Sequence, residues 1–83
     1  MPPKIYTRLA PNSVWRLPEP VISKVEANKL NMIPLTIGCL ESEYWILHNI
    51  MQDCLRANIN YCFVKGVQGV EIWKGTVKHN RQS

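Results

Sequence analysis

The chain contains few of the residues that mark a secreted scaffold or a metal centre. Its three cysteines, Cys39, Cys54 and Cys62, are odd in number and show no C-x-x-C spacing. A disulfide scaffold needs an even and denser set, so we expect reduced thiols in a cytoplasmic protein. Structural zinc sites need closely spaced pairs of ligands, and no two Cys or His residues have such spacing. We therefore expect no metal.

Motifs for catalysis and nucleotide binding are also missing. The sequence has no G-x-S-x-G, no P-loop and no G-x-G-x-x-G. Cys39 follows Gly38 at the start of a predicted helix, where the helix dipole would lower the pKa of a thiol. A buried, unreactive cysteine is nevertheless the more common occupant of such a position. We expect no enzyme activity, no catalytic residue and no cofactor.

Long hydrophobic runs are absent as well. No apolar stretch approaches the roughly 18 residues of a membrane span, and the opening Met-Pro-Pro-Lys has no apolar signal segment. We expect no membrane association. The length of 83 residues predicts one small domain over 1–83, with a frayed N-terminus at 1–4 and a basic C-terminal tail at 76–83.

The strongest periodic pattern lies between Glu41 and Asn58. At about 100° per residue, apolar residues fall on one broad face: Tyr44, Ile46, Leu47, Ile50, Met51, Cys54, Leu55 and Ala57. Acids at the beginning and Arg56 near the end of this segment suit the helix dipole. The sequence therefore predicts one long helix over about 41–58.

Two β-rich runs follow this helix and are separated by a turn that Gly66 and Gly69 bracket. The pattern predicts a β-hairpin over 61–74. Pairing of Lys65 with Val70 would place Phe63 opposite Ile72 on the face that packs against the helix.

The region before the long helix gives weaker signals. Pro20 suits the first position of a helix and Asn31 suits its end, which predicts a short helix near 20–30. Short extended pieces are expected at 5–9 and 14–17. Together these elements predict an α+β fold, in which the long helix packs on a small antiparallel sheet that includes the hairpin.

Positive charge gathers at the two ends of the chain, and the net charge is +4. The order helix, hairpin, basic tail resembles in outline the back half of a winged helix, although Glu41, Glu43 and Asp53 would repel phosphate. Stacking of bases on Trp15 or Trp73 would avoid that objection. We predict a small regulatory protein that binds nucleic acid through its basic ends and hairpin, with these contact residues: Lys65, Lys74, Lys78, Arg81 and Arg8.

One large aromatic residue lies on the polar face of the predicted long helix. Trp45 is surrounded there by His48, Asn49, Gln52 and Arg56, a combination typical of an interface hot spot. The alternative function is therefore a protein–protein interaction module, acting as a regulator, an inhibitor or an assembly subunit, or a homodimer through this face. Residues 5–17 could instead fold over Trp45 within the same chain. The sequence leaves this choice open.

Overall fold

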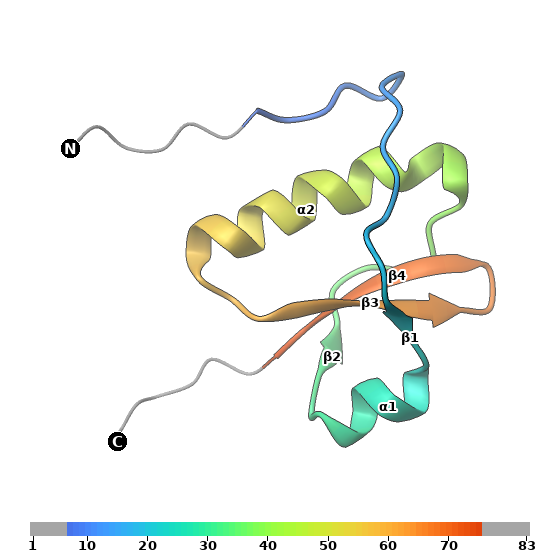
Figure 1. Ribbon diagram of the computed structural model, residues 1–83, viewed down its shortest axis with the longest axis vertical. Coiled ribbons are helices and arrows are strands. Elements are labelled where there is room, and N and C mark those ends of the chain that lie inside the picture. Colours follow the sequence, from blue (N-terminus) through green and yellow to red (C-terminus); the bar gives the residue numbers. More distant parts are fainter. Residues whose placement is uncertain (1–6, 76–83) are drawn as a thin grey trace.

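The computed structural model describes residues 7–75, which form a four-stranded mixed sheet with a helix on each face (Figure 1). The order of the strands across the sheet is β1-β3-β4-β2. The elements are β1 (Val21–Ile22), α1 (Lys24–Lys29), β2 (Ile33–Pro34), the 3₁₀ helix η1 (Glu41–Glu43), α2 (Tyr44–Ala57), β3 (Tyr61–Gly66) and β4 (Gly69–Lys74). The predicted α+β class and long helix are confirmed.

The β3–β4 hairpin has the predicted register, with Phe63 opposite Ile72 and Lys65 opposite Val70. Gly69, the first residue of β4 after the turn, has a φ of +108°, a conformation that residues with side chains rarely adopt. A Cβ atom there would also overlap the carbonyl group of Cys39. The position therefore requires glycine for two separate reasons.

The inner face of α2 packs on the hairpin, as its apolar periodicity predicts. Leu47 and Ile72 have no exposed surface, and they belong to the main core cluster with Cys39, Met51, Phe63 and Val70. Burying a side chain of this size stabilises a fold by about 1.5–3 kcal/mol. This cluster therefore fixes α2 on its face of the sheet.

The opposite face of the sheet is covered by α1, through a second cluster of Ala27, Val64 and Trp73. The prediction of a helix from about residue 20 was wrong at its start. The hydroxyl of Ser23 accepts a hydrogen bond from the Glu26 N–H at 3.1 Å, so Ser23 caps a shorter helix. The two residues before this cap instead form β1, which pairs in parallel with β3 and makes the sheet mixed rather than purely antiparallel.

The other edge of the sheet is formed by β2, which pairs antiparallel with β4. The Leu35 N–H donates to the Ile72 carbonyl at 2.8 Å. Since successive residues of a strand alternate in direction, the nitrogen of Pro34 faces away from the sheet. Ile33, Leu35 and Ile37 remain 47%, 41% and 86% exposed along this edge.

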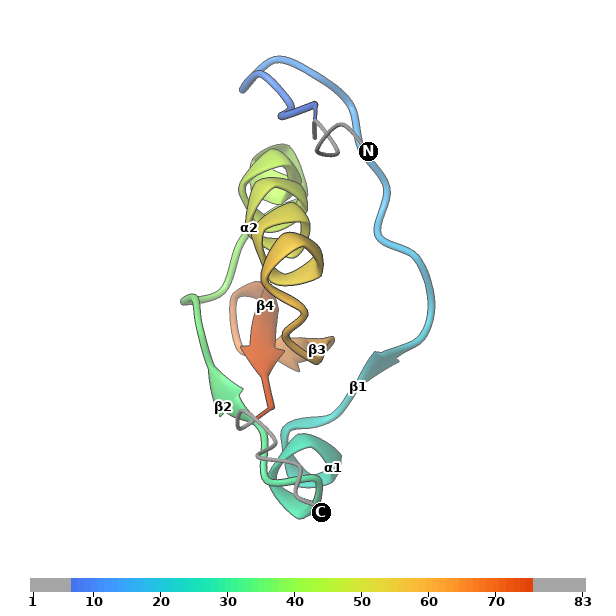
Figure 2. The same cartoon turned by 90° about the vertical axis from the view of Figure 1, so that its left-hand side faces the viewer.

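Residues 7–17, named the strap here, pass over the outer side of α2 and descend toward β1 (Figure 2). The strands expected at 5–9 and 14–17 are absent from the described part of those segments. The strap therefore folds over α2 within the same chain, as one alternative proposed, but it leaves Trp45 half-buried rather than fully covered. The frayed start at 1–4 and the basic tail at 76–83 lie outside the described residues.

Candidate functional site

The outer side of α2 holds the strap through a buried asparagine. Asn49 is only 9% exposed, although the helical pattern placed it on a polar surface. Its Oδ1 accepts the Leu9 N–H at 2.8 Å, and its Nδ2 donates to the Leu9 carbonyl at 3.1 Å. The side-chain amide thus pairs with both backbone groups of one residue, as a neighbouring strand would. This pairing explains how Leu9 is held without belonging to a strand.

A second contact between the strap and α2 is ionic. Arg8 Nη1 lies 2.7 Å from Asp53 Oδ1, and Arg56 Nη2 lies 3.0 Å from the same oxygen. The three side chains are about half exposed, and surface pairs of this kind contribute at most about 1 kcal/mol each. Asp53 therefore adds little stability to the strap contact, but it favours a positively charged strap residue such as Arg8.

The third contact is aromatic. The ring centroid of Trp15 lies 5.0 Å from that of His48, edge-on, and 5.9 Å from that of Phe63. Such ring pairs contribute about 0.5–1.5 kcal/mol beyond the burial of their area. The His48 Nδ1 is buried and has no hydrogen-bond partner among the described residues. His48 is therefore half-buried under the strap, although the helical pattern placed it on a polar face.

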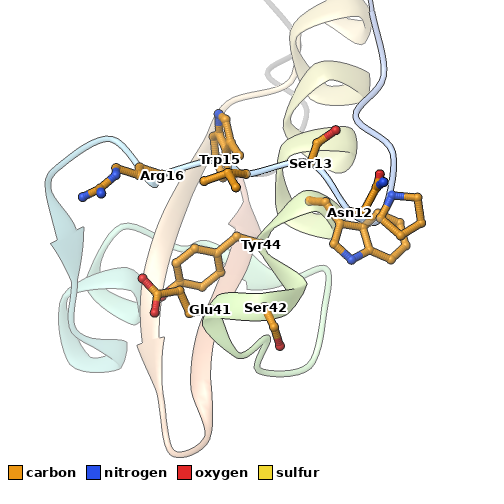
Figure 3. A pocket seen from close by; sticks show the side chains of 10 residues that line it. Asn12, Ser13, Trp15, Arg16, Glu41, Ser42 and Tyr44 are labelled. Atoms are coloured by element: carbon orange, nitrogen blue, oxygen red, sulfur yellow. The ribbon is translucent and has the colours of Figure 1, made fainter.

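A groove opens where the strap crosses the beginning of α2 (Figure 3). Its volume is about 390 Å³, and it is lined by residues 11–16 of the strap and by Glu41, Ser42, Tyr44 and Trp45. Figure 3 shows Trp15 and Arg16 on the strap side, with Tyr44 and Glu41 on the helix side. We call it the aromatic groove, since Trp15, Tyr44 and Trp45 all line it. It also holds one cationic and one anionic side chain.

The structure distributes the five predicted partner-binding residues over different roles. Trp45 lines the aromatic groove, whereas His48 and Asn49 contact the strap. Arg56 forms an ion pair with Asp53, and Gln52 is half-buried on the same helix. Of this set, the structure places only Trp45 among the residues that line the groove.

Sequence reasoning missed the strap residues that complete this site. As a functional residue, Trp15 had been considered only for stacking on bases, Tyr44 had been placed on the apolar face of the helix, and Arg16 had no assigned role. One signal was available: Trp15 is a large aromatic residue in a stretch with turn-forming and polar neighbours, where it needs a surface to cover. The sequence could not show that this surface is the start of α2.

The predicted nucleic-acid contacts do not form one patch within residues 7–75. Arg8 is paired with Asp53, while Lys65 and Lys74 lie opposite Val70 and Tyr61, about 13 Å apart at 3.3 Å per residue. Trp73 is 6% exposed and donates its indole N–H to Glu71 at 2.9 Å, so base stacking on Trp73 is ruled out. Lys78 and Arg81 lie outside the described residues.

Lys65 nevertheless has a basic neighbour. It lines a shallow depression of about 320 Å³ beside the hairpin turn, together with Lys24, Val25 and Val67. Lys24 Nζ also lies 3.8 Å from Glu71 Oε2, which reduces the net positive charge there. Residues 7–75 as a whole hold seven bases and six acids.

The three thiols lie in surroundings that favour the protonated form. Burial raises the pKa of Cys39, Cys54 and Cys62 above the ordinary value of 9.0, and nearby Glu43, Asp53 and Glu26, respectively, raise them further. Cys39 is buried two residues before η1, so of the two readings of this position it fits the buried cysteine. Within residues 7–75, no three His, Cys, Asp or Glu side chains gather closely enough to hold a metal ion.

Comparisons with protein-family models, curated proteins and solved structures found no match to this chain. Among residues 7–75, no helix has the length and hydrophobicity that a bilayer crossing requires. Any functional assignment therefore depends on the geometry of the groove and the distribution of charge.

Proposed function

We propose that this chain is a non-enzymatic module that binds another protein through the aromatic groove. The observation that supports the proposal is the convergence of Trp15, Tyr44 and Trp45 on one concave surface. Aromatic anchors in a partly desolvated recess carry much of the binding energy at protein interfaces. Arg16 and Glu41 supply charges of both signs around these rings, which suits a partner with a mixed polar segment.

The dimensions of the groove suit a short peptide segment rather than a large flat interface. Its volume of about 390 Å³ is near the lower end of typical ligand sites, which span roughly 300–1,000 Å³. A recess of that size holds one or two large side chains, with neighbouring residues lying on the polar rim. We therefore expect a partner that inserts an apolar anchor and contacts Arg16 or Glu41 beside it.

Selection from a random peptide library displayed against the full chain tests this function. We expect the selected peptides to bind with little dependence on salt, because burial of aromatic surface dominates. Trp45→Ala should weaken binding by about 30-fold or more, since truncated hot spots cost at least about 2 kcal/mol. Val67→Ala, at the distant and 90% exposed hairpin turn, is the matched control and should bind normally.

Two results would contradict the proposal: failure to select any binding peptide, or equal binding by Trp45→Ala and the native chain. Circular dichroism and thermal melting of Trp45→Ala would show whether the fold is intact. Glu41→Lys supplies a second variant, because it reverses a charge at the rim without removing core contacts. Peptides that carry a basic residue beside their anchor should lose affinity for that variant.

Binding of nucleic acid is the second candidate, and the pairing of Lys65 with Lys24 in one depression supports it. Affinity from phosphate contacts should fall steeply between about 50 and 200 mM salt. Removal of charge at Lys65, Lys74 and Lys78 should abolish it, whereas Trp45→Ala should not. The absence of binding to single-stranded and duplex nucleic acids at about 50 mM salt, where such contacts are strong, would exclude this candidate.

A further inference from the structure

The strap is attached to the rest of the fold by side-chain contacts. Within the described residues, the one backbone–backbone hydrogen bond of the strap joins Ser13 to Ala10 inside the strap itself. Its hydrogen bonds to α2 all use the side chains of Arg8, Asn49 and Asp53. The strap can therefore leave α2 without disturbing any backbone hydrogen bond of the helix or the sheet.

The surface under the strap, named the strap seat here, comprises His48, Asn49, Asp53 and Phe63. Asn49 binds backbone atoms, Asp53 binds a guanidinium, and the two rings pack against an indole. These groups recognise an extended segment by its chemistry, and the bonded residues lie 40 and 45 positions apart in the sequence. Nothing in these contacts requires that the segment belong to the same chain.

Residues 18–20, which connect the strap to β1, would also allow the strap to leave its own α2 and extend toward another chain. Residues 18–20 are Pro-Glu-Pro, all three are exposed, and no hydrogen bond is found for them within the described chain. Two of the three residues are prolines, which lack an N–H group and so cannot donate a backbone hydrogen bond to the sheet or to α2. Residues 18–20 therefore form a suitable hinge between the strap and β1.

We infer that two copies of the chain can exchange their straps, so that the strap seat of each copy holds the strap of the other. Exchange re-forms the same contacts between chains and therefore has a low energetic cost. The aromatic groove would then be built by α2 of one copy and by residues 11–16 of its partner. The partner is a second copy of this chain, because its strap already has the backbone, charge and indole that the seat binds.

The protein concentration determines whether a strap binds the seat of its own chain or the seat of a second copy. A short linker holds the strap near its own seat at an effective concentration on the order of 1 mM. The native chain should therefore be largely monomeric well below that concentration. A test needs chains in which the contact within one chain is weakened but the contact between two chains is intact.

Two full-length variants provide this test. Arg8→Ala/Trp15→Ala weakens the strap and keeps the seat, whereas Asn49→Ala/Asp53→Ala weakens the seat and keeps the strap. Each should be monomeric alone at about 0.1 mM, tenfold below the effective concentration. The mixture should form a 1:1 heterodimer, seen by size-exclusion chromatography with light scattering, since one intact strap can reach one intact seat.

The matched control replaces the first variant by Arg8→Ala/Trp15→Ala/Asn49→Ala, which should not form the heterodimer. A mixture of the two main variants that stays monomeric, with both chains folded by circular dichroism, would overturn the inference. Binding of peptides to the aromatic groove is measured separately in the native chain, so that either proposal can fail alone.

If those variants do not fold, deletion of Glu19 and Pro20 from the otherwise native chain gives an independent measurement. The shortened hinge restrains the strap from reaching its own seat while all contact residues remain. We expect a dimer with slow hydrogen exchange at the Leu9 amide, because Asn49 of the partner accepts that N–H. A monomer, with either slow or fast exchange at Leu9, would overturn the inference.

Discussion

The two sides of α2 are covered by different kinds of interaction. On the inner side, Leu47 and Met51 pack against the hairpin through apolar surface. On the outer side, Asn49, Asp53 and His48 hold the strap through hydrogen bonds, an ion pair and a ring contact. The inner contact is broad and non-directional, whereas the polar contacts between the strap and α2 depend on a few atoms at short distances. Trp15 and Leu17 of the strap also pack against the edge of the main core cluster.

This difference shows how one helix can serve both as core and as a receptor surface. Apolar packing supplies most of the stability of a small domain, whose margin is only about 5–15 kcal/mol. Directional contacts add less free energy, but they select what lies on the surface. The inner side of α2 therefore maintains the fold, and the outer side determines how the strap and the aromatic groove are arranged.

The largest effect should come from truncating the inner side. Leu47→Ala removes a side chain with no exposed surface and should cost about 3–5 kcal/mol, the usual range for such cavities. Leu55→Ala, on the same helix at 48% exposure, should cost well under half of that. Urea denaturation monitored by circular dichroism measures both, and equal losses would contradict the assignment of the inner face.

A smaller effect is expected from the outer side. Asn49→Ala removes both hydrogen bonds to Leu9 and should cost about 1–3 kcal/mol, since each contributes roughly 0.5–1.5 kcal/mol. The Leu9 amide should exchange its hydrogen faster, while amides within α2 remain protected. Gln52→Ala, at a half-buried position on the same helix, is the control and should change stability by less than about 0.5 kcal/mol. Unchanged exchange at Leu9 would refute the strap contact.

Alkaline pH should destabilise the packing between the inner side of α2 and the sheet. Burial raises the pKa of the Cys39 and Cys54 thiols and of the Tyr61 hydroxyl. The folded state therefore keeps these protons at a pH where the unfolded state loses them, and stability falls as pH rises above about 9. Urea midpoints measured from pH 7 to 10.5 test this, and Cys54→Ser should reduce the dependence. A midpoint that rises over this range would contradict it.

The smallest effect should come from the ion pair. Arg8→Gln removes a pair between half-exposed side chains and should cost about 0.2–1 kcal/mol. The loss should shrink toward zero in 1 M salt, where charges are screened beyond about 3 Å. Thermal melting at low and high salt measures this difference. A loss that does not depend on salt would show that Arg8 acts through packing instead.

The inner side of α2 was predictable because side-chain identity determines it. The spacing of Leu47, Met51 and Cys54 gives the buried stripe, and the glycines at 66 and 69 fix the register of the hairpin. The cap at Ser23 was also readable, because Ser-x-x-Glu is a known start signal for helices. The prediction used Pro20 as the start signal and did not consider this cap, which misplaced the beginning of α1.

The outer side was not predictable in the same way. Asn49 binds the backbone of Leu9, and backbone atoms are the same at every residue, so the sequence carries no mark of which residue is bound. β1 is only two residues long, too short for an alternating pattern to be detected. The sequence showed that Trp45 lies on the polar face of the helix. It could not show the groove beside Trp45, because that groove is formed by the path of the strap.

The position of Pro34 has a consequence for how this protein behaves when crowded. The β2 edge exposes three large hydrophobic side chains, Ile33, Leu35 and Ile37. Exposed hydrophobic edge strands tend to pair with strands of other chains. The outward-facing nitrogen of Pro34 carries no hydrogen. It therefore cannot donate a backbone hydrogen bond to a strand of another chain that pairs with this edge. Contacts at that margin are thereby restricted to side chains, and stacking into fibres is disfavoured.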